Sequence, residues 1–202
     1  LKRYPAADAN KDGVLTLTEA KAFQKLRRER EAKRPVLKPT QADIAYGTHA
    51  RHKLDLWLKD SDRPTPLLIC IHGGGFRAGD KSSYHRQVNL IKRMHAAGIS
   101  VASINYRYTE GGKNPLPGAM HDAARAVQYL RHNARRFNLD KTRFAATGGS
   151  AGACILMWLG FHDDLADPDN ADPVKRESTR LIALAPSGGQ PTISPVNFRE
   201  WF

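Results

Sequence analysis

Apolar residues along most of the chain follow two patterns that alternate, namely short continuous runs and helical stripes. The continuous runs are typical of strands that are covered on both faces. They lie at residues 67–71, 99–104, 144–147 and 181–185. Residues 53–59 instead place Leu54, Leu56 and Leu58 on one face, which predicts a strand exposed on its other side.

Helical stripes lie between these expected strands. Val88, Ile91 and Met94 form one stripe, and alanines between residues 119 and 134 form most of another. Strands and helices that alternate in this way form right-handed crossovers. The pattern therefore predicts an α/β domain with a mostly parallel sheet and helices on both faces.

The first part of the chain has a different character. Residues 1–34 are polar and contain no strand-like run, and Pro35 and Pro39 indicate a stiff connector. We therefore expect an N-terminal segment with its linker at residues 1–37 and the α/β domain at residues 38–202.

Within the N-terminal segment, residues 8–19 have the spacing of an EF-hand loop, and residues 17–33 would form its exit helix. A glycine, Gly13, stands where the loop must turn sharply. The alternative is an acidic turn that caps a helix without a metal. We expect weak, structural Ca²⁺ binding and no cofactor for catalysis. The expected ligands are Asp8, Asn10, Asp12, the Val14 carbonyl and Glu19, with a water linked to Thr16.

The charge and the cysteine content of the chain bear on which partners and covalent links it has. The chain has 202 residues and a formal charge of +12, but its basic residues are spread along the sequence. The one dense cluster, residues 25–34, contains Glu29 and Glu31 and is typical of a solvated helix, so we expect no nucleic-acid partner. Cys70 and Cys154 lie in apolar runs and are expected to be buried free thiols.

No apolar stretch is long enough to span a membrane. No signal peptide is visible, although the start at Leu1 is compatible with the removal of one. A secreted or periplasmic location is the working expectation.

A glycine-rich motif at residues 148–152, Gly-Gly-Ser-Ala-Gly, follows the strand expected at 143–147 and precedes an apolar segment of helical length. This is the context of a nucleophile elbow, in which a sharp turn presents Ser150 above the edge of the sheet. Small neighbours are needed because the backbone is crowded at such a turn.

A second motif, His-Gly-Gly-Gly at residues 72–75, directly follows the strand expected at 67–71. Amide groups of such a loop can point at a developing oxyanion. Either glycine cluster alone would be explained by a tight turn or an anion-binding loop. Two motifs in this order favour nucleophilic catalysis.

The segments HGGGFRAGDK (72–81), NYRY (105–108) and GGSAG (148–152) resemble the HGGG esterases. These include hormone-sensitive-lipase-like esterases and the related feruloyl and acetyl-xylan esterases. The resemblance covers about residues 44–202 and implies the α/β-hydrolase fold.

The resemblance also implies roles for individual residues. Ser150 would be the nucleophile, and the backbone N–H groups of Gly74, Gly75 and Ala151 would form the oxyanion hole. His72 would shape the loop and would not act as the base. Asp80 and Lys81 belong to the matching segment, but helix capping or an ion pair explains them as well as substrate contact does, so we assign them no chemistry.

The chain departs from the family pattern in its acid and base. Asp122 precedes the serine, whereas the acid follows it in this fold, so we expect Asp122 to have a structural role. His162 is the only histidine after Ser150, and a continuous helix would place it ~18 Å along the axis from the serine. We therefore expect the acid and base beyond Phe202, in a C-terminal part of the domain that the sequence lacks.

The function predicted from these motifs is hydrolysis of small or acylated-sugar carboxylic esters through an acyl-enzyme. Amide or formamide hydrolysis is an alternative on the same fold. A catalytically incomplete, calcium-dependent binding module is an alternative from a different class.

Overall fold

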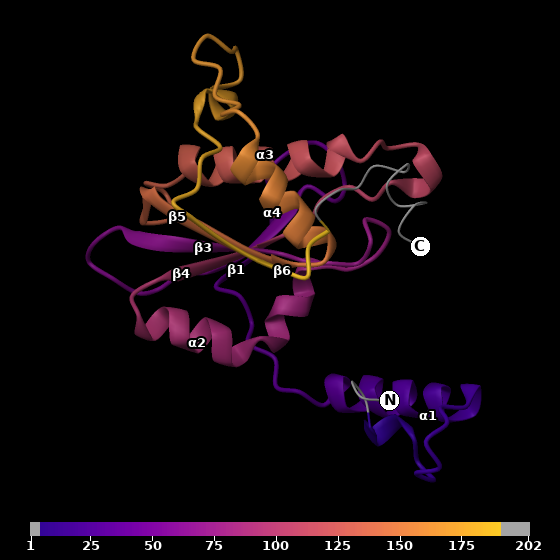
Figure 1. The fold of residues 1–202 in the computed structure, drawn as a ribbon. Coiled ribbons are helices and arrows are strands. Elements are labelled where there is room, and N and C mark those ends of the chain that lie inside the picture. Colours follow the sequence, from indigo (N-terminus) through magenta and orange to yellow (C-terminus); the bar gives the residue numbers. More distant parts are fainter. Residues whose placement is uncertain (1–4, 191–202) are drawn as a thin grey trace. The chain divides into compact units, whose positions relative to one another are not determined.

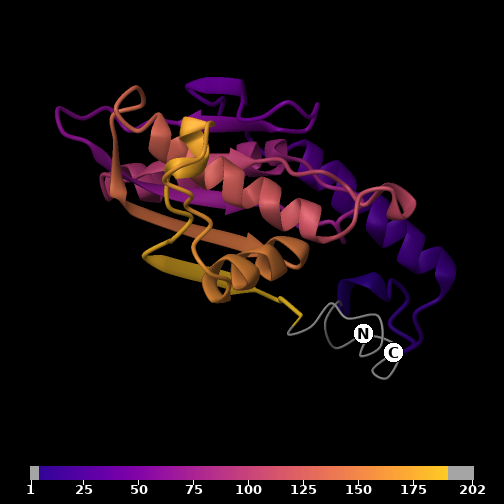
Figure 2. The same ribbon diagram turned by 90° about the horizontal axis from the view of Figure 1, so that it is seen from above.

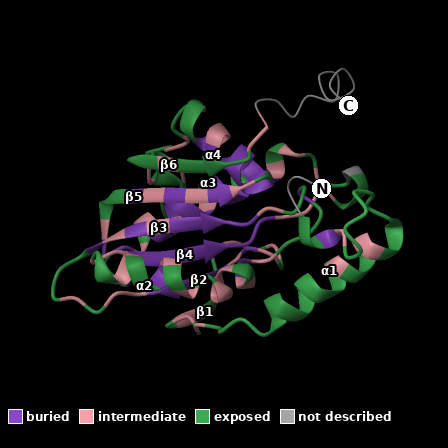
Figure 3. Cartoon of the chain, turned by 60° about the horizontal axis from the view of Figure 1, so that its bottom comes forward, coloured by how far each residue is buried: buried purple, intermediate pink, exposed green. Residues whose placement is uncertain are grey.

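The computed structural model describes residues 5–190, and the chain divides into two compact units between Val36 and Leu37. The N-terminal unit contains the short 3₁₀ helix η1 (Pro5–Ala7) and helix α1 (Leu17–Ala32). Thr16 and Glu19 form a reciprocal capping box at the start of α1. No residue of α1 is buried, so this helix has no core of its own (Figure 3).

Within residues 37–190, the larger unit is built around a six-stranded sheet in the order β1-β2-β4-β3-β5-β6. Its strands are β1 (Gln41–Ala45), β2 (Lys53–Trp57), β3 (Thr65–Ile71), β4 (Ser100–Ile104), β5 (Leu139–Gly149) and β6 (Ala183–Ser187). Strand β2 is antiparallel to β1 and β4, and the strands from β4 to β6 are parallel. Figure 2 shows this order running from the purple edge of β1 and β2 to the yellow edge of β6.

Helices cover both faces of this sheet. Helix α2 (Val88–Ala96) packs on one face, and α3 (Pro117–His132) and α4 (Ala151–Phe161) pack on the other (Figure 1). The 3₁₀ helices η2 (Lys81–Arg86), η3 (Glu110–Gly112) and η4 (Pro173–Arg176) lie in the connections. The expected α/β architecture is confirmed.

The continuous apolar runs form the centre of the core. Strands β3 and β4 are the most buried part of the sheet (Figure 3), because helices cover both of their faces. Alanines at positions 119, 123 and 126 give α3 a small, buried face that packs closely on the sheet. Cys70 and Cys154 are buried free thiols, as expected.

Two strands differ from expectation. Strand β1 was not foreseen, because its five residues are short and largely polar. Strand β6 was expected to be covered on both faces, yet only Leu184 within it is partly buried. Within residues 5–190 its one partner strand is β5, and α4 is the helix that packs most closely against it. None of the helices among residues 5–190 is long and apolar enough to cross a membrane.

Candidate active site

Ser150 lies at a sharp turn between β5 and α4. Its backbone angles are φ 53° and ψ −120°, outside the regions that side-chain-bearing residues favour. The turn is fixed at both ends, because the Ser150 N–H donates to the Ser187 carbonyl at 2.9 Å and its own carbonyl accepts from Cys154 N–H at 3.0 Å. The side chain of Ser150 is exposed. This backbone therefore presents the hydroxyl to solvent at the carboxyl edge of the parallel strands.

The glycines that flank Ser150 are needed because the backbones of β3 and α4 approach closely. A Cβ atom on Gly148 would lie 2.8 Å from the Ile71 carbonyl oxygen. A Cβ atom on Gly152 would collide with the same carbonyl. Larger residues would push the elbow away from the end of β3, where the glycine-rich loop begins.

That loop, residues 72–80, packs directly against the elbow. A Cβ atom on Gly73 would lie 2.8 Å from the Gly149 carbonyl oxygen and 3.3 Å from the Cβ of Ser150. Gly74 and Gly75 have φ values of 125° and 58°, which favour glycine. The structure thus brings together the two motifs that are separated in the sequence.

Three backbone amides, those of Gly74, Gly75 and Ala151, were expected to form an oxyanion hole. The N–H groups of Gly74 and Gly75 have no acceptor within residues 5–190, although the Gly74 carbonyl accepts bonds from Arg77 and Ala78. Ala151 is the first residue of α4, where a helix leaves its N–H groups without intrahelical acceptors. These donors are available to an anionic oxygen.

His72 is buried and shapes the loop. Its ring stacks on Tyr106 with centroids 4.4 Å apart, and its Nδ1 lies 2.7 Å from the Gly73 carbonyl oxygen. Burial lowers the pKa of His72, since it disfavours the imidazolium, and the charge of Arg51 lowers it further. In the neutral ring with its proton on Nδ1, this nitrogen donates to the Gly73 carbonyl. The His72 side chain therefore binds the backbone of its own loop.

The end of the loop is anchored by buried charges. Asp80 caps η2 by accepting from Ser82 N–H. The ammonium of Lys81 lies 2.7 Å from Asp55, which is fully buried, and 2.8 Å from Asp43. His85 also contacts Asp55, at 2.7 Å. Asp80 therefore caps a helix and Lys81 forms ion pairs within the fold.

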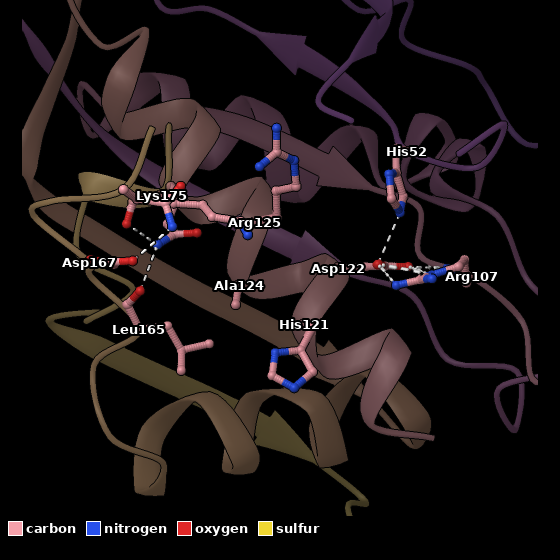
Figure 4. A pocket seen from close by; sticks show the side chains of 11 residues that line it. His52, Arg107, His121, Asp122, Ala124, Arg125, Leu165, Asp167 and Lys175 are labelled. Atoms are coloured by element: carbon pink, nitrogen blue, oxygen red, sulfur yellow. Dashed lines mark hydrogen bonds and ion pairs between the residues drawn. The ribbon is translucent and has the colours of Figure 1, made fainter. Parts of the chain in front are cut away.

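Asp122 lies on α3 within a separate polar cluster (Figure 4). It accepts from Arg107 at 2.7 Å and lies 3.0 Å from His52. Burial raises its pKa, but the close contact with His52 and the hydrogen bonds from Arg107 outweigh burial and hold the pKa below its usual range. These groups border a cavity of about 450 Å³ that is also lined by Arg125 and Lys175. Asp122 therefore joins α3 to the neighbouring loops.

The base of a catalytic triad is not found at Ser150. None of the chain's eight histidines, all within the part that the structure describes, hydrogen-bonds to the Ser150 hydroxyl. His162 is half-buried against Trp158, with ring centroids 4.2 Å apart, and its Nδ1 lies 3.0 Å from the Asp163 carbonyl oxygen. His121 packs edge-on against the same tryptophan.

The N-terminal unit forms a compact acidic loop. Asp8 accepts from Gly13 N–H at 2.9 Å, Asn10 accepts from Asp12 N–H at 3.1 Å, and Asp12 accepts from Val14 N–H at 2.8 Å. Gly13 has a φ of 84°, which explains why glycine stands there. Through these bonds the side chains of the loop bind its own backbone N–H groups and fold it into a tight turn.

Two observations bear on a metal in this loop. The Oδ1 atom of Asp8 is buried and has no hydrogen-bond partner, as expected of an atom that can bind a cation. Glu19, however, accepts from Thr16 and from Ala9 N–H, and no group of three or more acidic, histidine or cysteine side chains within residues 5–190 is gathered closely enough to hold a metal. The residue types fit calcium, but Glu19 would have to give up its hydrogen bonds from Thr16 and Ala9 in order to bind the ion.

One positioning contact was not foreseen from the sequence. Arg51, in the turn before β2, reaches the glycine-rich loop and the segment after β4. No motif marks it, because its partners are far away in the sequence.

A mostly parallel sheet with a serine at the strand–helix elbow and a glycine-rich loop beside it defines an α/β-hydrolase. The BD-FAE profile matches residues 54–183, well over half of the chain. The chain therefore belongs to the BD-FAE family.

Esterase LipQ of Mycobacterium tuberculosis is 32% identical over 73% of this chain and 35% of its own length. A versiconal hemiacetal acetate esterase of Dothistroma septosporum is 28% identical over 64% of this chain and 37% of its own length. The chain thus spans less than half the length of these curated relatives.

The same fold occurs in solved structures. The acetyl ester-xyloside bifunctional hydrolase of Caldicellulosiruptor lactoaceticus matches with a TM-score of 0.63 and 24% identity. The match covers 74% of this chain and 57% of that one. It confirms the expected α/β-hydrolase fold.

Proposed function

We propose that this protein hydrolyses carboxylic esters, with Ser150 as the nucleophile. The observation that carries the proposal is the contact between the strained elbow at Ser150 and the loop at Gly73, beside two amides without acceptors. A hydroxyl next to free amide donors is suited to attack on a carbonyl and to stabilisation of the oxyanion. The esterase relatives support the same reaction.

The reaction follows from these positions. The Ser150 oxygen bonds to the ester carbonyl carbon while its proton passes to a general base, and the carbonyl oxygen accepts from the N–H groups of Gly74, Gly75 and Ala151. Breakage of the ester C–O bond leaves the acyl group on Ser150, and the alcohol departs with the proton. Water then releases the acid by the same steps. The general base has to come from outside the described residues.

We propose small or acylated-sugar esters as substrates. The exposed Ser150 suits a substrate that approaches from solvent, and the related solved structure is named for acetyl ester and xyloside hydrolysis. Amide or formamide hydrolysis remains the alternative, because the same hydroxyl and amides serve either leaving group.

A kinetic comparison tests the reaction class. The natural polypeptide that contains residues 1–202 should hydrolyse p-nitrophenyl acetate far faster than p-nitroformanilide. Ser150→Ala should lower kcat at least ~10³-fold, because it removes the hydroxyl that attacks the ester carbonyl. Ser178→Ala, a change distant in sequence, should retain parental kcat. Equal rates for Ser150→Ala and its parent would contradict the proposal, and preference for the formanilide would select the alternative.

We also propose that residues 8–19 bind Ca²⁺ in a structural role. The buried Oδ1 of Asp8 and the oxygen-rich loop support this second proposal. Asp8, Asn10, Asp12, Val14 and Glu19 would supply the oxygen ligands. The ion would stabilise the loop and would take no part in ester hydrolysis. A calcium-dependent binding module without catalysis is the alternative that this loop permits.

Calorimetric titration with CaCl₂ tests the loop. Glu19→Gln preserves a side chain suitable for the capping box while it removes the carboxylate, so it should weaken calcium binding without unfolding α1. Asp8→Asn should weaken binding likewise, and Asp62→Ala, outside the loop, should not. Binding that is equally strong in Glu19→Gln and its parent would contradict the site. Esterase activity that requires calcium would contradict the structural role.

A further inference from the structure

Arg51 stands between the two segments that frame the oxyanion loop. Its side chain is only 21% exposed. The Nε donates to the Tyr106 carbonyl at 2.8 Å, and the guanidinium lies over the Tyr108 ring, 3.7 Å from its centroid. These contacts tie the turn before β2 to the segment that follows β4.

The same guanidinium contacts both ends of the glycine-rich loop. One terminal nitrogen, Nη2, lies 3.4 Å from His72 Nε2 and donates to the Gly79 carbonyl at 3.2 Å. The other, Nη1, lies 3.8 Å from the Asp80 carboxylate. The two ends are pressed together, since a Cβ atom on Gly79 would collide with the Gly73 carbonyl. Arg51 therefore links the first residue of the loop to its last two residues.

Two contacts favour the same protonation of the His72 ring. The Gly73 carbonyl can only accept, which favours a proton on Nδ1, and arginine can only donate, which favours an unprotonated Nε2. Nδ1 lies 2.7 Å from the Gly73 carbonyl oxygen and donates to it. The Gly73–Gly74 peptide is planar and trans, so its N–H points opposite to its C=O. Fixing the Gly73 carbonyl thus fixes the direction of the Gly74 N–H.

We propose that Arg51 is a positioning residue for ester hydrolysis: through His72 and the Gly73 carbonyl, it holds the Gly74 N–H in the direction that binds the oxyanion. This inference rests on the proposed function. Arg51 itself does not touch the reacting atoms. A lysine can replace it only in part, because one ammonium lacks the planar set of donors that reaches His72, Gly79 and Tyr106 together.

Kinetics on the natural polypeptide test this role. Arg51→Met keeps the length of the apolar stem and removes the donors. It should lower kcat for p-nitrophenyl acetate about 10- to 100-fold while KM changes less than about threefold, because an oxyanion donor acts mainly in the transition state. Arg51→Lys should lose kcat to an intermediate extent. Deuterium exchange at residues 72–80 should accelerate in Arg51→Met.

Arg125→Met is the matched control. Arg125 is similarly exposed, at 29%, and its guanidinium likewise binds backbone carbonyl and carboxylate oxygens, here one carbonyl, that of Tyr46, and one carboxylate, that of Asp172. Its loss should leave kcat within about twofold of the parent. A kcat decrease of equal size in both variants would overturn the proposal by showing a general structural effect.

The outcomes separate the two proposals. If the parent hydrolyses the ester and Arg51→Met retains its kcat and its loop exchange, the role of Arg51 alone is wrong. If the parent does not hydrolyse the ester, the proposed function is wrong, and the catalytic role of Arg51 is wrong with it.

Discussion

Ser150 combines an exposed hydroxyl with a backbone conformation that a side chain makes unfavourable. The hydrogen bonds to Ser187 and Cys154 impose this conformation, and residues held in such regions destabilise a fold by about 1–3 kcal/mol. A strained residue that contributes nothing to the core is expected where its side chain performs chemistry. The free energy stored at this position can be measured separately from activity.

Ser150→Gly should therefore raise the free energy of unfolding by about 1 kcal/mol relative to Ser150→Ala, because glycine tolerates a positive φ and alanine does not. Both variants should lack esterase activity. Denaturant unfolding of the two proteins provides the comparison. Identical midpoints would show that the elbow is not strained.

Gly74 is the residue whose replacement should affect the oxyanion loop most directly. A Cβ atom there would collide with the Ala78 carbonyl, and the φ of 125° is unfavourable for alanine. Gly74→Ala should lower kcat about 10²-fold or more through displacement of the amide. Gly98→Ala is the control, since Gly98 also has a positive φ, of 75°, but a Cβ atom there would have open space. A comparable loss of kcat in the control would argue against a local effect at the loop.

Among the secondary-structure elements, α3 depends on a buried charge for its attachment. Asp122 is 2% exposed and is held by Arg107 and His52 (Figure 4). Its pKa lies below the unfolded value, so its carboxylate stabilises the fold above about pH 4. This contribution is lost as the pH falls through the folded-state pKa.

Asp122→Asn should accordingly lower the free energy of unfolding by about 3 kcal/mol at pH 7, since Arg107 keeps its charge without a counterion. The difference from the parent should shrink as the pH falls below about 4, where the parent's carboxylate becomes protonated. Denaturant unfolding at a series of pH values measures this difference. A difference that is constant from pH 7 to pH 3 would contradict the assignment.

The core elements could be predicted from sequence because their signals are local. The apolar runs of β3 and β4 and the alanine face of α3 each specify an element without distant information. Strand β1 lacks such a signal, because it is short and largely polar and lies at the edge of the sheet that the described residues form. The exposure of β6 also depends on what packs around it, which no local pattern records.

At the scale of the whole molecule, the candidate site is formed by segments far apart in the chain. Ser150 and Gly74 could be named as candidates because each lies in a recognisable motif, although their proximity follows only from the adjacent parallel strands β3 and β5. Arg51 could not be predicted, since His72, Gly79 and Tyr106 are its partners through space alone. The base of the triad is absent from the surroundings of Ser150 within residues 5–190.

The central claim is that Ser150 is a catalytic nucleophile, and covalent labelling of the natural polypeptide tests it most directly. A fluorophosphonate should add once per chain, and peptide mass mapping should place the adduct on Ser150, because its phosphoryl oxygen can occupy the oxyanion hole. Ser150→Ala should remain unlabelled under the same conditions. Absence of an adduct on the folded parent, or an equal adduct on Ser150→Ala, would contradict the account.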